Sequence, residues 1–312
     1  MGTSSQGQYT VSFQTDGGSA VPSVTVAGGT TLSQIIVDPT KAASGGTTYY
    51  FGDWYTVDAA TGHTGKTKYD YTKPVTGNMT LYARWYTEQP ARPEDLKLLI
   101  TTDNGDFNHI DVRQVTDMDE LFASKNTFNG DISGWDVSGT TDMNSMFFQA
   151  EEFNQPIGDW DVSNVTNMSR MFYRTEKFNQ PIGDWDVSNV INMSNIFYRA
   201  EEFNQPIGDW DVSGATNMSW MFYRAEKFNQ SIESWNVSKV TNMSAMFFEA
   251  TVFNQPIGSW NVSGVSYMFN MFNKAIAFNQ NISGWTVIRV TGSTDIFKDS
   301  GISSAFKPSK FR

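Results

Sequence analysis

The sequence predicts an α+β fold in which a small strand-rich module precedes a solenoid of 25-residue strand–helix coils. Tryptophan and phenylalanine each recur every 25 residues, and asparagine follows each of these phenylalanines. A period of about 20 to 50 residues indicates stacked repeats that bury their apolar faces against one another. Residues 9–86 lack the repeat and alternate apolar with polar side chains instead. The two columns are Trp135, Trp160, Trp185, Trp210, Trp235, Trp260 and Trp285, and Phe128, Phe153, Phe178, Phe203, Phe228, Phe253 and Phe278.

Composition restricts the partners that the protein can have. The chain has 312 residues, a formal net charge of −11 and no cysteine. Nucleic-acid binding needs clustered lysine and arginine, so we expect no nucleic-acid partner. No apolar run is long enough to cross a membrane, and we expect no membrane insertion. Residues 1–8 are polar and are expected to be a disordered leader without the features of a signal peptide.

Residues 9–86 contain four strand signals. YTVSF and VPSVTV alternate on either side of Gly17 and Gly18, which predicts a β-hairpin. TTYYFGDWYT and MTLYARW are aromatic-rich strands separated by a polar segment. Between these pairs, TTLSQIIV (30–37) is predicted to form one short helix.

The segments TVSFQTDGG, FGDWYT and KYDYTKPVTGNMTLYARW resemble the Listeria–Bacteroides repeat, the B-repeat of internalin-type surface proteins. Asp53, between Gly52 and Trp54, departs from the pattern of that family. The resemblance covers residues 9–86. It implies a β-grasp-like module of secreted bacterial proteins, which usually acts as a spacer or in adhesion.

The remaining chain divides into four segments by composition and register. Residues 87–94 contain two prolines and mixed charge and are predicted to be a linker. Residues 95–117 and 298–312 are expected to cap the two ends, because terminal repeats must present an atypical outer face. Residues 118–297 hold the repeat.

The pattern of a single repeat predicts a strand, a bend, a helix and a second bend. IGDWDVS alternates around Trp160 and Val162, which predicts a strand with both side chains pointing inward. From Met168 to Phe178 the apolar residues follow helical spacing and predict a short helix. This order gives a leucine-rich-repeat-like coil, and I-x-x-W-x-V matches the L-x-x-L-x-L segment of that class.

The phrase M-F-x-x-A-x-x-F-N-Q-P-I-G-D-W-D-V-S-N-V-T-N-M resembles the BspA-like repeats of bacterial surface proteins. The resemblance covers residues 107–297. It implies a leucine-rich-repeat-like solenoid on a secreted or surface-anchored protein, for which adhesion or host interaction is the usual role.

Four columns are candidates for the binding face or the core. The tryptophans are expected in the core, with a sugar-stacking platform as the alternative. The asparagines after each phenylalanine are expected to cap turns between coils, with ligand contact as the alternative. Outward aspartates would form two like-charged ladders, which solvent, local backbone N–H groups, a basic partner or Ca²⁺ could compensate. The ladders comprise Asp159, Asp184 and Asp209 and, beside them, Asp136, Asp161, Asp186 and Asp211.

A second candidate face combines tyrosine and arginine, which are enriched at binding hot spots. Its members are Tyr173, Tyr198 and Tyr223 with Arg174, Arg199 and Arg224. Alternatively, the tyrosines cover the apolar face and the arginines pair with neighbouring glutamates. Trp220 breaks its column and is the best single candidate for an exposed anchor.

We expect no enzyme activity, because only two histidines are present and an active site would normally break the repeat. The expected function is non-catalytic recognition at a bacterial cell surface or in the extracellular medium. A monomeric adhesin would bind an extracellular protein or glycan, without a cofactor unless Ca²⁺ is held. The alternatives are a structural spacer and a carbohydrate-binding accessory module.

Overall fold

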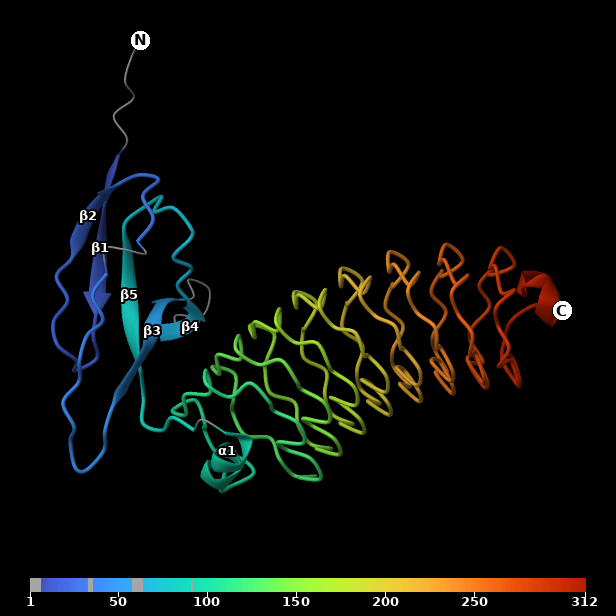
Figure 1. Cartoon of the computed structure of the whole chain (residues 1–312), viewed down its shortest axis with the longest axis horizontal. Coiled ribbons are helices and arrows are strands. Elements are labelled where there is room, and N and C mark those ends of the chain that lie inside the picture. Colours follow the sequence, from blue (N-terminus) through green and yellow to red (C-terminus); the bar gives the residue numbers. More distant parts are fainter. Residues whose placement is uncertain (1–6, 33–35, 58–63, 91) are drawn as a thin grey trace, which may run out of the picture. The chain divides into compact units, whose positions relative to one another are not determined.

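The computed structural model describes residues 7–32, 36–57, 64–90 and 92–312, in two compact units (Figure 1). The first unit comprises residues 1–89 with 108–111, and the second comprises residues 90–107 with 112–312. The expected disordered leader lies outside the described residues up to residue 6.

The first unit is built on one five-stranded sheet in the order β2-β1-β5-β3-β4. β1 and β2 form the predicted antiparallel hairpin, and β1 pairs in parallel with β5. β3 pairs in antiparallel fashion with both β5 and β4. The strands are β1 (Gln8–Gln14), β2 (Val24–Ala27), β3 (Tyr50–Val57), β4 (Thr64–Lys68) and β5 (Met79–Tyr86).

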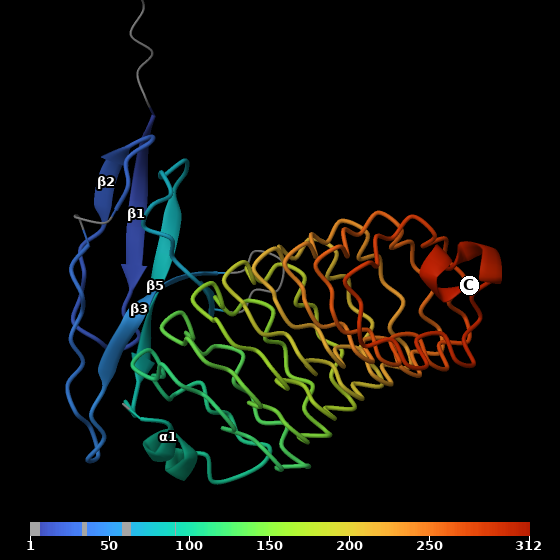
Figure 2. The same cartoon turned by 45° about the vertical axis from the view of Figure 1, so that its right-hand side comes forward.

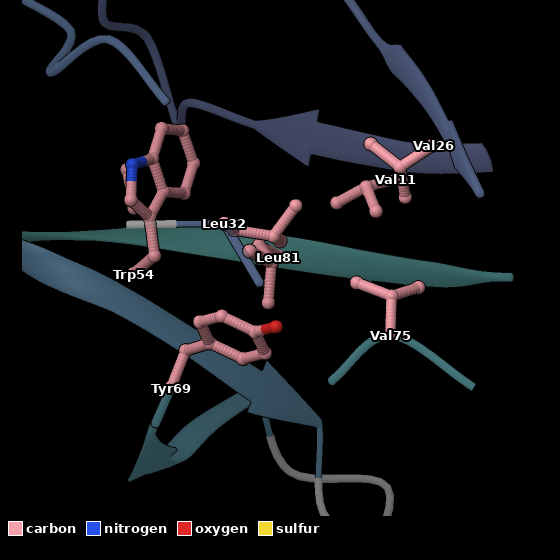
Figure 3. Packing of buried hydrophobic residues seen from close by; sticks show 8 residues of the cluster. Val11, Val26, Leu32, Trp54, Tyr69, Val75 and Leu81 are labelled. Carbon is pink, nitrogen blue, oxygen red and sulfur yellow. The ribbon is translucent and has the colours of Figure 1, made fainter. Parts of the chain in front are cut away.

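The core of this unit gathers the inward side chains of several strands around Leu81 (Figure 3). Trp54 is fully buried, and Phe13 packs edge-on against it at 4.9 Å between ring centroids. The helix expected at 30–37 is not seen at residues 30–32 or 36–37, and residues 33–35 lie outside the described part. The described residues of this unit form no helix that could complete the expected β-grasp-like arrangement.

The second unit begins with α1 (Pro93–Leu99), the one α-helix among the described residues. Proline opens it, Glu94 and Asp95 lie in its first turn, and Leu96 is its buried contact. These features suit a helix N-terminus, where a proline loses no hydrogen bond and acidic groups favour the dipole. Short 3₁₀ turns at Ser304–Phe306 and Ser309–Phe311 lie near the C-terminus.

The repeats form a stack of 25-residue coils without helices or extended strands, so the α+β class and the strand–helix coil were wrong (Figure 2). At 168–178, where a helix was expected, the chain makes successive turns. Arg170 and Arg174 have φ angles of 57° and 54°, in the left-handed region that an α-helix cannot contain. Their N–H groups donate to the next coil, from Arg170 to Ser194 O at 2.9 Å and from Arg174 to Tyr198 O at 2.6 Å.

Contact between neighbouring coils is parallel and strictly in register. Single-residue bridges join equivalent positions, such as Asn167 with Asn192 and Asn192 with Asn217. The predicted strand over IGDWDVS is replaced by turns at residues 158–159 and 163–164. We refer to residues 112–302 as the coil stack.

The core of the coil stack is made of aromatic ladders. The tryptophans of the repeat are buried, and each indole N–H donates to a backbone carbonyl 28 residues earlier, as from Trp210 to Ile182 O at 2.9 Å. The phenylalanines stack on one another, with Phe178 and Phe203 separated by 6.0 Å between centroids. The expectation that the tryptophans form core is therefore confirmed.

The asparagine column bonds each coil to the next. Asn204 Oδ1 accepts hydrogen bonds from Asn229 N at 3.0 Å and from Gln230 Nε2 at 3.1 Å. The same pair of bonds recurs along the stack, for example at Asn179. These amides therefore cap the turns between coils, as expected.

Candidate binding surface

The aspartates lie in or beside turns of the coils and not in the outward strand that was expected. Asp136 is partly exposed, and the other six aspartates are exposed. Asp161 Oδ1 accepts from Ser163 N at 3.1 Å and from Ser163 Oγ at 2.6 Å. Asp186 accepts from Ser188 N, and Asp211 from Ser213 N, both at 3.0 Å.

The carboxylates of Asp161, Asp186 and Asp211 thus accept hydrogen bonds within their own turns. Hydrogen bonds from Ser213 hold the pKa of Asp211 below its ordinary value. Among the described residues, no group of three or more His, Cys, Asp or Glu side chains is placed to hold a metal ion. The arrangement favours the turn-capping alternative for Asp161, Asp186 and Asp211.

The tyrosine column is a continuous stack of rings on the surface. Tyr173 and Tyr198 lie 4.2 Å apart between centroids, and Tyr198 and Tyr223 lie 4.4 Å apart, with nearly parallel planes. Phe148 and Phe248 extend the stack at its two ends, each at 4.6 Å. Burial, and next the neighbouring tyrosine, raises the pKa of Tyr173 and of Tyr198. All three tyrosines remain partly exposed.

The arginines beside this stack are paired with glutamates. Arg174 lies 3.8 Å from Glu151, and Arg199 lies 3.4 Å from Glu201. Arg224 pairs with Glu249, which also accepts from Lys274 Nζ at 2.6 Å. Surface pairs of this kind contribute about 0–1 kcal/mol each, so they orient the guanidinium groups more than they stabilise the fold.

Trp220 adjoins the tyrosine stack. Its side chain is 39% exposed, and its ring centroid lies 6.1 Å from that of Tyr198 and 5.2 Å from that of Tyr223. The structure therefore brings the predicted anchor together with the predicted tyrosine–arginine face. We call these seven residues the aromatic strip: Tyr173, Arg174, Tyr198, Arg199, Trp220, Tyr223 and Arg224.

Two exposed aromatic residues were missed by the sequence reasoning. Tyr267 is 47% exposed and Phe269 is 39% exposed, with ring centroids 6.1 Å apart. The four preceding coils carry asparagine at the first position, as in Asn242, and serine at the second, as in Ser244. Comparing the columns could have found both residues by the signal that identified Trp220. With Trp220 they line an open hollow of about 380 Å³, whose other lining residues are Asn242, Ser244, Ala245 and Asn270.

No helix in the described part of the chain has the length and apolar character needed to cross a membrane.

Comparison with known families identifies both parts of the chain. Residues 9–84 match the Listeria-Bacteroides repeat domain. Residues 98–208 and 191–308 match a second family, whereas no curated protein and no solved structure gives a significant match. The two bacterial repeat domains suggest a surface-type protein, and neither match carries a leucine-rich-repeat description. Because the second family spans more than half of the chain, the protein belongs to the family described as Mycoplasma protein of unknown function, DUF285.

Proposed function

We propose that this protein is a non-catalytic adhesin of a bacterial surface, which binds an extracellular protein or glycan through the aromatic strip. One observation carries the proposal: the strip keeps large aromatic rings partly exposed in consecutive coils. Other phenylalanines and tryptophans of the same coils are buried. Exposed aromatic groups gathered on one face mark an interaction site more often than scattered ones do.

The composition of the strip suits recognition. Tyrosine, tryptophan and arginine are the residues most enriched at binding hot spots. Stacking at 4.2 Å and 4.4 Å on either side of Tyr198 fixes the rings before a ligand arrives. Pre-organised side chains lose little entropy on binding, so more of the contact energy appears as affinity.

The extracellular placement is part of the proposal and is supported by the two bacterial repeat domains. A monomer displayed on the cell surface would present the coils to a large ligand. The net charge of −11 favours a partner that is neutral or basic over nucleic acid or an anionic surface.

The test is a binding screen of the full chain against matrix proteins and glycan arrays, with Tyr198→Ala and Trp220→Ala beside the wild type. Lys239→Ala, an exposed substitution outside the strip, is the control. We expect both strip variants to weaken binding about tenfold or more, as is typical of hot-spot truncation. Lys239→Ala should bind as the wild type does. A ligand bound equally by all variants would contradict the assignment to the strip. The absence of any ligand would leave a spacer as the better account.

A further inference from the structure

We infer that the hollow beside Trp220 is a subsite for one neutral sugar ring of a glycan. This inference rests on the proposed function and names its ligand class. The hollow is the place where three columns of the repeat change character within three successive coils. Trp220 follows polar residues in its column, and two coils later Tyr267 and Phe269 replace asparagine and serine.

The floor of the hollow is a small residue between two large ones. Ala245 occupies the position equivalent to Trp220 in the following coil, and Asn270 occupies it one coil later. Successive coils here lie about one ring spacing apart, as shown by 5.7 Å between Phe222 and Phe247. Alanine therefore leaves an open space between the tryptophan on one side and the Phe269 and Asn270 side chains on the other.

A glycine makes room for the aromatic pair. A Cβ added at Gly292 would lie 2.4 Å from two ring carbons of Phe269 and 2.9 Å from a ring carbon of Tyr267. Gly292 occupies the position equivalent to Tyr267 in the next coil, where earlier coils have asparagine or aspartate. The aromatic wall and the missing side chain therefore occur together and depend on each other.

Two amide side chains of the hollow have their oxygens engaged within the protein. Asn242 Oδ1 accepts from Ser244 N at 3.0 Å, and Asn270 Oδ1 accepts from Asn273 Nδ2 at 2.9 Å. With these oxygens engaged, the side-chain N–H groups are what the two amides have left to donate to a ligand. None of the seven lining residues is charged.

A sugar ring matches this combination of groups. Its C–H faces pack on the electron-rich faces of aromatic rings, and its hydroxyl groups accept hydrogen bonds from amide donors. A volume of about 380 Å³ lies at the small end of the usual range for ligand pockets. An apolar peptide side chain would cover the amide donors without pairing them, which costs free energy. The lack of a cation in the lining disfavours sulfated or sialylated units.

The test uses the full chain and a panel of methyl glycosides of glucose, galactose, mannose, N-acetylglucosamine and N-acetylgalactosamine. Saturation-transfer-difference NMR detects weak binding and reports which sugar protons face the protein. The main variant is Tyr267→Asn with Phe269→Ser, which restores residues that other coils carry at these positions and so should fold. Ile276→Thr, at a residue that is 63% exposed and outside the hollow, is the control.

We expect at least one glycoside to bind the wild type and Ile276→Thr equally, and to bind the double variant at least tenfold more weakly. Trp220→Ala should weaken the same sugar to a similar degree. No binding by any glycoside, or equal binding by the double variant, would overturn the inference. A protein ligand that depends on Tyr198 while no sugar binds would overturn the subsite and leave the proposed function standing. If a sugar binds in the hollow and Tyr198→Ala changes the binding of no ligand, the subsite would stand and the assignment of binding to the aromatic strip would be overturned.

Discussion

Replacing Asn204 by alanine should weaken the contact between two neighbouring coils. The substitution removes the oxygen that accepts from Asn229 N at 3.0 Å and from Gln230 Nε2 at 3.1 Å. Gln230 Nε2 keeps its bond to the Asn204 backbone carbonyl at 3.0 Å, so only the Asn229 N–H loses its acceptor. A buried unpaired donor costs about 1–3 kcal/mol, and partial exposure here places the loss at about 1–2 kcal/mol. The unfolding midpoint should fall by about 2–8 °C.

Asn204→Asp is the matched control, because aspartate keeps an acceptor oxygen at the same position. We expect it to lose less than half of what alanine loses. Thermal unfolding followed by circular dichroism gives the midpoints, and hydrogen exchange measures the Asn229 amide directly. Faster exchange at Asn229 in the alanine variant alone would support the reasoning. Equal destabilisation by alanine and aspartate would refute it, as would an unchanged Asn229 exchange rate in the alanine variant.

Two further substitutions test coil spacing and surface charge. Gly183→Ala would place a Cβ 2.5 Å from the backbone oxygen of Pro206, and it should lower the free energy of unfolding in urea by about 1–3 kcal/mol. Gly284→Ala is the control, because a Cβ there meets open space and should leave stability nearly unchanged. Equal effects of the two substitutions would contradict the clash. The pKa of Glu176 is raised, first by burial and then by the charges of Glu201 and Glu151. The folded state thus holds this proton more tightly, and stability falls as pH rises above the ordinary value of 4.5 and through the raised pKa of the folded state. Glu176→Gln should raise the urea midpoint at pH 7, with the gain vanishing below about pH 4; a gain that persists in acid would exclude this charge effect.

Which side chains face the core could be predicted, but the backbone that places them there could not. When the same residue recurs at one position of every repeat, its chemistry indicates whether that position is buried or bonded. Trp210 was therefore correctly predicted in the core, and Asn204 in a turn. The apolar spacing from Met168 to Phe178 suggested a helix because that spacing reports only which side chains share a face. Alternating turns with left-handed residues present the same face, and arginine at 174 gives no sign of a positive φ.

The candidate site divides in the same way. Asp161 was expected in an outward strand, although the D-V-S sequence that ends at Ser163 is also the pattern of a side chain capping its own turn. The sequence shows Trp220 as an exception in its column, but it does not show which residues face Trp220 across the hollow. Tyr267 and Phe269 lie 47 and 49 positions further along the sequence, and only stacking in register brings them to one surface.

The left-handed positions explain how the coil stack can carry a binding site without losing its repeat. A non-glycine residue there costs about 1–2 kcal/mol, and its backbone N–H bonds to the next coil offset the cost, as between Trp220 N and Ser244 O at 2.8 Å. Those bonds use no side chain, so the residue is free to vary. The column contains Glu120, Ser145, Arg170, Asn195, Trp220, Ala245, Asn270 and Asp295, all with positive φ. Buried columns hold the coils in register while this column, in which Ser145 and Ala245 are buried and the other side chains reach the surface, changes from coil to coil. Such a column is where a ligand preference can be encoded.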